Sequence, residues 1–202
     1  MAGKIERKYL AHYLDSAFNT NYVQTSDESV VTGKTYYTRS GSAGSYVYTA
    51  VANPVAADLD EYYEVKGVYV RLGKDLEEYN EALNPEVEVN KNILGEQNVQ
   101  HNGYEVQSEV SPFYAYEGDA LFEQLCLVAN KRLTGDDCMA TKVDVLLDST
   151  GNVVWAYRED CYVVPGQIGG NTSGVQIPFT VYNAGNRVEG DFDTETKEFT
   201  PI

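Results

Sequence analysis

Histidine, cysteine and tryptophan are scarce in this chain of 202 residues, which has two His, three Cys and one Trp. Cys126, Cys138 and Cys161 are odd in number and show no CxxC spacing, so we expect reduced core thiols of a cytosolic protein instead of a disulfide framework or a zinc site. Neither His12 nor His101 stands in a nucleophile pattern, and no G-x-S-x-G or HExxH motif occurs. The sequence therefore predicts a protein that is not an enzyme, with no cofactor and no metal.

Basic residues are also few, with 15 Lys and Arg against 31 Asp and Glu and a formal net charge of −16. This balance argues against binding nucleic acid through its phosphates, which needs clustered cations. No apolar run approaches the roughly 20 residues of a membrane span, and residues 1–10 lack the apolar core of a signal peptide. We therefore expect no membrane insertion and no phosphate-binding surface.

One segment, residues 118–131, has the periodicity of an amphipathic helix. Apolar side chains recur on one face at Leu121, Phe122, Leu125, Val128 and Ala129. An aspartate at position 119 can accept N–H bonds at the start, and a glycine at position 135 can end the helix. A single apolar stripe must be buried against a sheet, so we expect a core helix without catalytic chemistry.

Most other segments alternate apolar and polar residues, as half-buried strands do. His12 lies among apolar neighbours and is expected to be packed, not catalytic. Pro178 predicts an edge or a bulge in one of the strands. The expected strands are 5–18, 85–89, 142–147, 153–157, 161–164 and 175–182, with a last hairpin at 188–193 and 197–199. The fold class that follows is mainly β, in sandwich or barrel style, with one flanking α-helix.

Residues 84–111 predict a long polar hairpin region with few side chains that could anchor a core. Asn102–Gly103 is a good two-residue turn between the segments 99–101 and 104–106. A projection of this kind usually finds a partner surface, although a mobile surface hairpin is the alternative.

Residues 23–67 differ from the rest because they are rich in Ser, Thr, Gly and Tyr, with turn clusters at 32–34 and 40–44. They predict a small inserted β-module of two or three strands, which leaves 1–22 and 68–202 as the main domain. Tyr36, Tyr46 and Tyr62 are candidates for surface binding of sugars. Tyrosines more often hold a small sheet together, and that reading stays open beside the first.

Several strings outside the insertion resemble the major tail tube protein of long-tailed bacteriophages. They are spread in order over most of the chain, and the insertion itself is similar to a tyrosine-rich module that recurs in phage structural proteins. The strings are residues 4–12, 71–80, 84–88, 91–96, 155–160, 172–179 and 184–188.

This resemblance implies a β-sandwich flanked by the helix 118–131, and a hexameric ring in which the sheets join into one β-barrel around a lumen. Stacked rings would form the tube of the virion tail, assembled in the host cytoplasm. The implied partners are further copies of the chain, the tape-measure protein and the tail terminator and initiator proteins, while DNA passes through without specific binding. The region 84–111 would reach a neighbouring subunit or ring. Its candidate contact residues are Glu86, Glu88, Lys91, Asn92, Asn102 and Gly103.

The acidic composition agrees with a conduit for DNA, because lumenal carboxylates would repel phosphates within a Debye length of about 8 Å. Glu86 and Glu88 are expected either in the lumen or at ring contacts, and the insertion is expected on the exterior. Two alternatives remain open. One is a carbohydrate-binding β-sandwich module, and the other is the tube protein of a phage-derived contractile injection device.

Overall fold

The computed structural model describes residues 5–32, 34–43, 45–74, 76 and 78–202. Lys4, Asp75 and Glu77, which belong to the tail-tube-like strings, and Gly33 and Gly44 of the predicted turns lie outside the described residues. The chain divides into two units, one of Met1–Phe18 with Val68–Ile202 and one of Asn19–Gly67. The second unit therefore starts at residue 19, before the expected boundary at residue 23.

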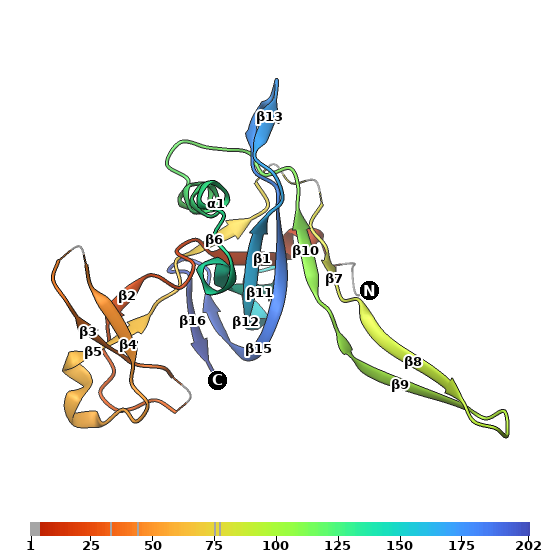
Figure 1. The fold of residues 1–202 in the computed structure, drawn as a ribbon, viewed down its shortest axis with the longest axis horizontal. Coiled ribbons are helices and arrows are strands. Elements are labelled where there is room, and N and C mark those ends of the chain that lie inside the picture. The colour runs from red at the N-terminus through yellow and green to blue at the C-terminus, as the bar shows by residue number, and fades with distance from the viewer. Residues whose placement is uncertain (1–4, 33, 44, 75, 77) are drawn as a thin grey trace. The chain divides into compact units, whose positions relative to one another are not determined.

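The first unit is built on an antiparallel sheet of eight strands that curls into a half-barrel (Figure 1). The strand order is β6-β1-β11-β12-β15-β10-β7, and β16 pairs with β15. These strands are β1 (Leu10–Asp15), β6 (Tyr69–Leu72), β7 (Glu81–Ala82), β10 (Gln107–Val110), β11 (Met139–Leu147), β12 (Val153–Pro165), β15 (Phe179–Asp193) and β16 (Glu198–Pro201). The prediction of a mainly β fold is confirmed.

The turn between β11 and β12 forms in the gap between the expected strands 142–147 and 153–157, and Asp148 organises it. The Asp148 carboxylate accepts the backbone N–H groups of Thr150 (2.7 Å) and Asn152 (3.0 Å). These hydrogen bonds favour the charged form and hold the pKa of Asp148 at about 2, with the Thr150 hydroxyl as the largest contributor. Such an Asx turn is a local feature that a sequence can specify by itself.

The prediction of a single strand at 175–182 is wrong. Two elements replace it, β14 (Gly174–Gln176), which pairs with β13 (Gly169–Asn171), and β15, which begins at Phe179. Pro178 separates them because it has no N–H to donate to a ladder. Its carbonyl oxygen instead accepts a hydrogen bond from Gly166 N (2.9 Å).

The predicted helix is present as α1 (Ala120–Lys131), the one α-helix among the described residues. Asp119 caps it by accepting from Leu121 N (3.0 Å) and Phe122 N (3.3 Å). The helix ends at Arg132 and not at Gly135. Arg132 adopts the left-handed conformation (φ 53°), which lets Leu133 N bond to Val128 O and places Leu133 against the core. Short 3₁₀ turns are η1 (Arg7–Tyr9) and η3 (Gly135–Cys138).

The first unit has two hydrophobic clusters. The larger lies beneath α1, where Leu121, Leu125 and Val128 pack against sheet residues that include Leu14 and Val163. The smaller one gathers seven buried residues of β1, β6, β11, β12 and β15. Its members are Ala11, Tyr13, Tyr69, Val143, Val145, Ala156 and Phe192. The apolar stripe of the helix is therefore part of the core, as the sequence predicts.

The second unit is a sheet in the order β2-β5-β3-β4. It contains β2 (Tyr22–Gln24), β3 (Tyr37–Ser40), β4 (Val47–Ala50), β5 (Tyr62–Val65) and the 3₁₀ turn η2 (Ala56–Glu61). It thus has four strands where two or three were expected. The fully buried ring of Tyr36 packs with Leu59 and Tyr62, and its hydroxyl donates to Asp27 Oδ2 (2.6 Å).

Leu125→Ala should lower the free energy of unfolding by about 2–5 kcal/mol, because it leaves a cavity at a fully buried position beneath α1. Leu127→Ala makes the same change on the exposed side of the helix and should stay within about 0.5 kcal/mol of wild type. Urea unfolding followed by circular dichroism measures both. Equal losses would contradict the assignment of the buried face.

Candidate assembly surface

The hairpin formed by β8 (Pro85–Lys91) and β9 (Gln97–Tyr104) leaves the first unit as a two-stranded arm (Figure 1). It continues from β7 and β10 through hydrogen bonds between Asn84 and Glu105. Every residue of β8 is exposed, and in β9 only Gly103 is partly covered. The arm is therefore ordered by its own ladder and by none of the hydrophobic clusters.

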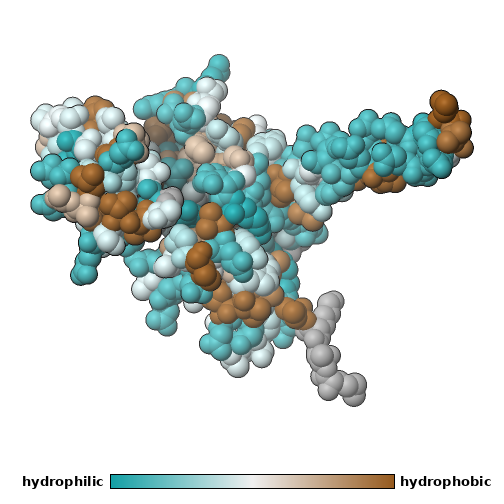
Figure 2. All heavy atoms as spheres, turned by 90° about the horizontal axis from the view of Figure 1, so that it is seen from below, coloured by the Kyte–Doolittle hydropathy of each residue, from teal (hydrophilic) through white to brown (hydrophobic). Residues whose placement is uncertain are grey.

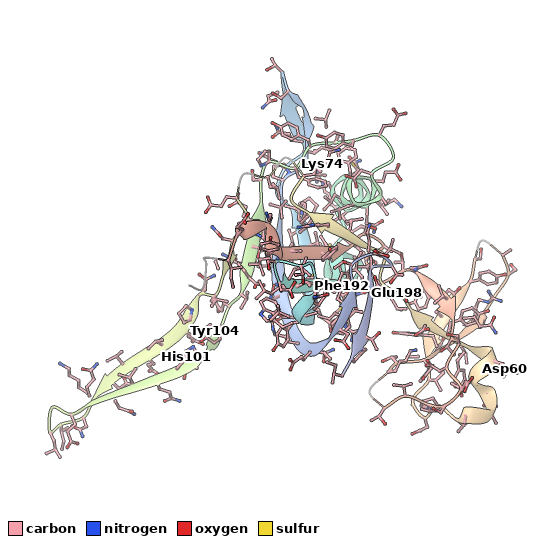
Figure 3. All side chains as sticks on the ribbon, turned by 180° about the vertical axis from the view of Figure 1, so that it is seen from behind. Asp60, Lys74, His101, Tyr104, Phe192 and Glu198 are labelled. Carbon is pink, nitrogen blue, oxygen red and sulfur yellow. The ribbon has the colours of Figure 1, made fainter. Side chains whose placement is uncertain are left out.

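The arm has two chemically different faces. Val89 lies opposite Val99, and Val87 lies opposite His101, so these four side chains share one face. Tyr104 extends that face, with its ring 4.5 Å from the ring of His101 (Figure 3). The opposite face is polar and is formed by Glu86, Glu88, Asn90, Asn98 and Gln100. An apolar strand face that nothing in the arm covers is a surface suited to a partner.

The tip of the arm is its most apolar part. Ile93 and Leu94 form the turn and are 102% and 78% exposed. The turn is built by Asn92, whose Oδ1 accepts from Leu94 N (3.0 Å) and Glu96 N (2.9 Å). Figure 2 shows hydrophobic surface at this end of an otherwise largely hydrophilic arm. Two large aliphatic side chains held outward at a loop tip make this tip a candidate contact surface.

The turn predicted at Asn102–Gly103 is wrong. Both residues lie inside β9, where Gly103 pairs with Glu86 and His101 with Val87. Asn102 is the extra residue of a β-bulge, and the chain runs on toward β10. The Asn-Gly pair favours a local turn, but the hairpin turn forms at Asn92 instead. The pairing of β9 with β8 then extends through Asn102 and Gly103 and keeps them in the strand. The predicted region 84–111 is also too long, because Ser108 and Val110 are buried in the body.

The six residues assigned to subunit contacts all lie on this arm. Glu86 and Glu88 are exposed on its polar face. Lys91 and Asn92 lie beside the tip, and Asn102 and Gly103 form the bulge near its base. The sequence did not single out Ile93 and Leu94, although two consecutive large aliphatics next to Asn92 and Gly95 are the signal that indicates an apolar tip.

The tyrosines proposed as a sugar-binding surface are not together on a surface. Tyr36 and Tyr62 are 0% and 5% exposed and form the core of the second unit, so this prediction is corrected for both. Burial of their rings is what stabilises so small a sheet. Tyr46 is exposed and lies against the guanidinium of Arg39.

A second group of tyrosines, which the sequence did not single out as a site, lies on the other face of the inserted sheet. Tyr22 and Tyr48 stack with their ring centres 3.9 Å apart, and Tyr37 and Tyr63 meet them edge-on. All four are half-buried. Along β3 and β5, Tyr37 and Tyr63 alternate with Thr38 and Tyr62. This alternation is the sequence signal that assigns the two pairs to opposite faces of the sheet.

A buried charged cluster is the second notable site of the first unit. His12 Nδ1 lies 2.7 Å from Asp144 Oδ1, which confirms that His12 is packed. Lys142 Nζ lies 3.1 Å from Asp144 Oδ2 and is paired with Glu81. Burial opposes the ionisation of Asp144, but the His12 hydrogen bond and the Lys142 charge outweigh it and hold its pKa below the usual range.

This cluster extends toward solvent along β12 and β15. Arg187 Nη1 donates to Glu159 Oε2 (2.8 Å), and the same oxygen accepts from Asn183 Nδ2 (2.9 Å). Removing one member would leave a buried charge without compensation. The cluster therefore fixes the strands of the sheet relative to one another. The sequence could not indicate it, because its members lie far apart along the chain.

Among the described residues, no three His, Cys, Asp or Glu side chains are placed to hold a metal ion. The described part also contains no helix with the length and apolar character to cross a membrane. Comparison of the chain with protein-family models, with curated proteins and with solved structures finds no match.

Asp144→Asn should lower the free energy of unfolding at pH 7 by on the order of 3 kcal/mol, because Lys142 loses a buried partner. The folded pKa of Asp144 is below its unfolded value of 3.8, so its contribution is complete above that value and is lost as the pH falls through the folded pKa. The gap between variant and wild type should therefore shrink below about pH 4.

Urea unfolding at a series of pH values measures this gap. Asp136→Asn removes an exposed carboxylate and should track the wild type throughout. A gap for Asp144→Asn that does not change with pH would contradict the assignment.

Proposed function

We propose that this chain is a structural subunit that assembles with copies of itself through the β8–β9 arm. The assembly we propose is a stack of hexameric rings that forms the tail tube of a long-tailed bacteriophage, made in the host cytoplasm and carried in the virion. Its partners are then the tape-measure protein and the tail terminator and initiator proteins, and its role is not catalytic.

The observation that carries the proposal is the arm itself. Its apolar face and tip expose Val87, Val89, Ile93, Leu94 and Val99, each at 49% or more. Fully burying one such side chain contributes about 1.5–3 kcal/mol. A partner that covers even part of this surface gains several such contributions, and this offsets the entropy of ordering the arm.

The polarity of the chain supports a passage for DNA. The net charge of −16 disfavours adhesion of a polyanion, and Glu86 and Glu88 present two carboxylates on the polar face of the arm. We propose that both acids face the lumen, since they stand on the polar face of the arm, opposite the apolar face that we assign to the subunit contact. An acidic lumen remains part of the proposal.

The double variant Ile93→Asp/Leu94→Asp should abolish assembly while leaving the body folded, since the tip contacts none of the hydrophobic clusters. Negative-stain electron microscopy and light scattering at high concentration measure assembly, with circular dichroism for the fold. We expect rings or tubes from the wild type and monomers from the variant.

Asn98→Asp/Gln100→Asp is the matched control, because it adds the same two charges to the polar face of the arm. This control should assemble as the wild type does. The proposal fails if the tip variant also assembles, or if the wild type stays monomeric at every concentration.

A further inference from the structure

Four apolar side chains of the first unit form a patch outside its two hydrophobic clusters. Leu10 of β1 lies opposite Leu146 of β11, and Leu146 lies opposite Trp155 of β12. Opposite residues of neighbouring strands point to one face, and Tyr157 points there too because it is two residues further along β12. All four are half-buried, and neither cluster of the unit includes them. We call these four residues the Trp155 patch.

Helix α1 covers only one end of this sheet face. Leu14 has the same orientation as Leu10, because the two are four residues apart in one strand. Leu14 is fully buried in the cluster beneath α1, whereas Leu10 is half-buried outside that cluster. The hydrogen-bonded pair of His12 and Asp144 lies between the two ends. The Trp155 patch is thus the end of the face that α1 leaves uncovered.

The patch contains the residue types on which protein contacts most depend. The ring centres of Trp155 and Tyr157 are 5.7 Å apart, and the guanidinium of Arg187 lies 4.7 Å from the centre of the Tyr157 ring. The Arg187 side chain is held by Glu159 and is still 41% exposed. Trp, Tyr and Arg are enriched among the residues that carry most of the binding energy of interfaces. Their large, rigid surfaces bring contact area at a low cost in conformational entropy.

The charges beside the patch restrict which partner fits it. Arg187 and Glu189 lie two residues apart on β15, and Glu189 is opposite Tyr157, so one cation and one acid flank the rings. The arm tip has the same combination, with Lys91 and Glu96 on either side of its two aliphatic residues. Opposite charges can therefore meet in one orientation of tip and patch. Such pairing also counters the repulsion between two copies that each carry a net charge of −16.

The arm presents its tip to another molecule. Seven residues of β8 at about 3.3 Å each place the tip about 23 Å from the base of the arm. The tip residues Ile93 and Leu94 are the most exposed large aliphatic side chains of the arm. A second copy of the chain offers a patch of matching character, apolar at its centre and charged with both signs at its edge.

We infer that the Trp155 patch is the acceptor site for the arm tip of a second copy of this chain. The two tip aliphatics of one copy pack on the Trp155 and Tyr157 rings of the next, with the tip acid toward Arg187 and the tip lysine toward Glu189. Each copy then gives its arm to one neighbour and receives an arm from another, as a head-to-tail contact requires. This inference rests on the proposed function, because it names the surface that the arm meets.

Trp155 is the one tryptophan of the sequence, so its fluorescence allows a direct test on full-length chains. The acceptor chain is Ile93→Asp/Leu94→Asp, which keeps Trp155 but has a charged tip. The donor chain is Trp155→Phe, which keeps the tip and has no tryptophan emission. When the donor is titrated into the acceptor, every tryptophan signal comes from the patch of the acceptor.

We expect the donor to move the Trp155 emission to shorter wavelength and to reduce its quenching by acrylamide, saturably. A donor that carries both Trp155→Phe and the charged tip is the matched control and should change neither.

The patch itself is tested by Trp155→Ala, which should weaken self-association of the otherwise unchanged chain about thirtyfold or more, the scale of a hot-spot residue. Val154→Ala truncates the neighbouring exposed side chain, which points to the other side of the strand, and should assemble as the wild type does. Light scattering measures assembly, and circular dichroism confirms the fold of each variant.

The inference is overturned if the donor leaves the Trp155 emission unchanged at concentrations at which the wild type assembles, or if the charged-tip donor changes it equally. In both cases the rings or tubes of the wild type leave the proposed function standing. A wild type that stays monomeric, with no response of Trp155 to the donor, refutes the proposed function and this inference together.

Discussion

The first unit is organised around the long antiparallel ladder of β11, β12 and β15. Its long antiparallel pairings run from the cluster beneath α1, past the buried charges, to the cluster closed by β16. One face of these strands changes along its length from apolar to charged. The charged stretch is tolerated because each carboxylate has a partner: Asp144 meets Lys142 of its own strand and His12 of β1, and Glu159 meets Arg187 and Asn183 of β15. Register in this sheet is therefore fixed by pairing of charges as well as by packing.

The fold class, the helix and the turn at Asp148 could be predicted because each depends on signals within a few residues. The stripe of α1, its cap at Asp119 and the Asx turn are local, and so is the alternation of the strands. The end of the helix could not be predicted. Gly135 also has a positive φ (63°), but the helix already ends at Arg132, whose left-handed conformation gives Leu133 a place in the core.

The candidate assembly surface was predicted as a region and missed in its details. Polar alternation over residues 84–111 indicated a projecting hairpin. The choice between a turn at Asn102–Gly103 and one at Asn92 depended on the register of two strands, which no local motif determines. The roles of Tyr36 and Tyr62 were equally open. A tyrosine-rich strand shows which residues alternate but not which of its two faces becomes the core.

The separation of the arm from the hydrophobic clusters has a consequence for how such a chain can evolve. Substitutions in a core alter stability at once, which limits how far they can drift. The arm does not depend on packing against the body, because the backbone hydrogen bonds of β8 are made to β9 and the tip is exposed. Changes at Ile93, Leu94 or the valines of the apolar face would therefore be free to follow changes in the partner that we propose for the arm. Under that proposal, specificity for the partner could diverge between lineages while the sheet beneath α1 stays the same.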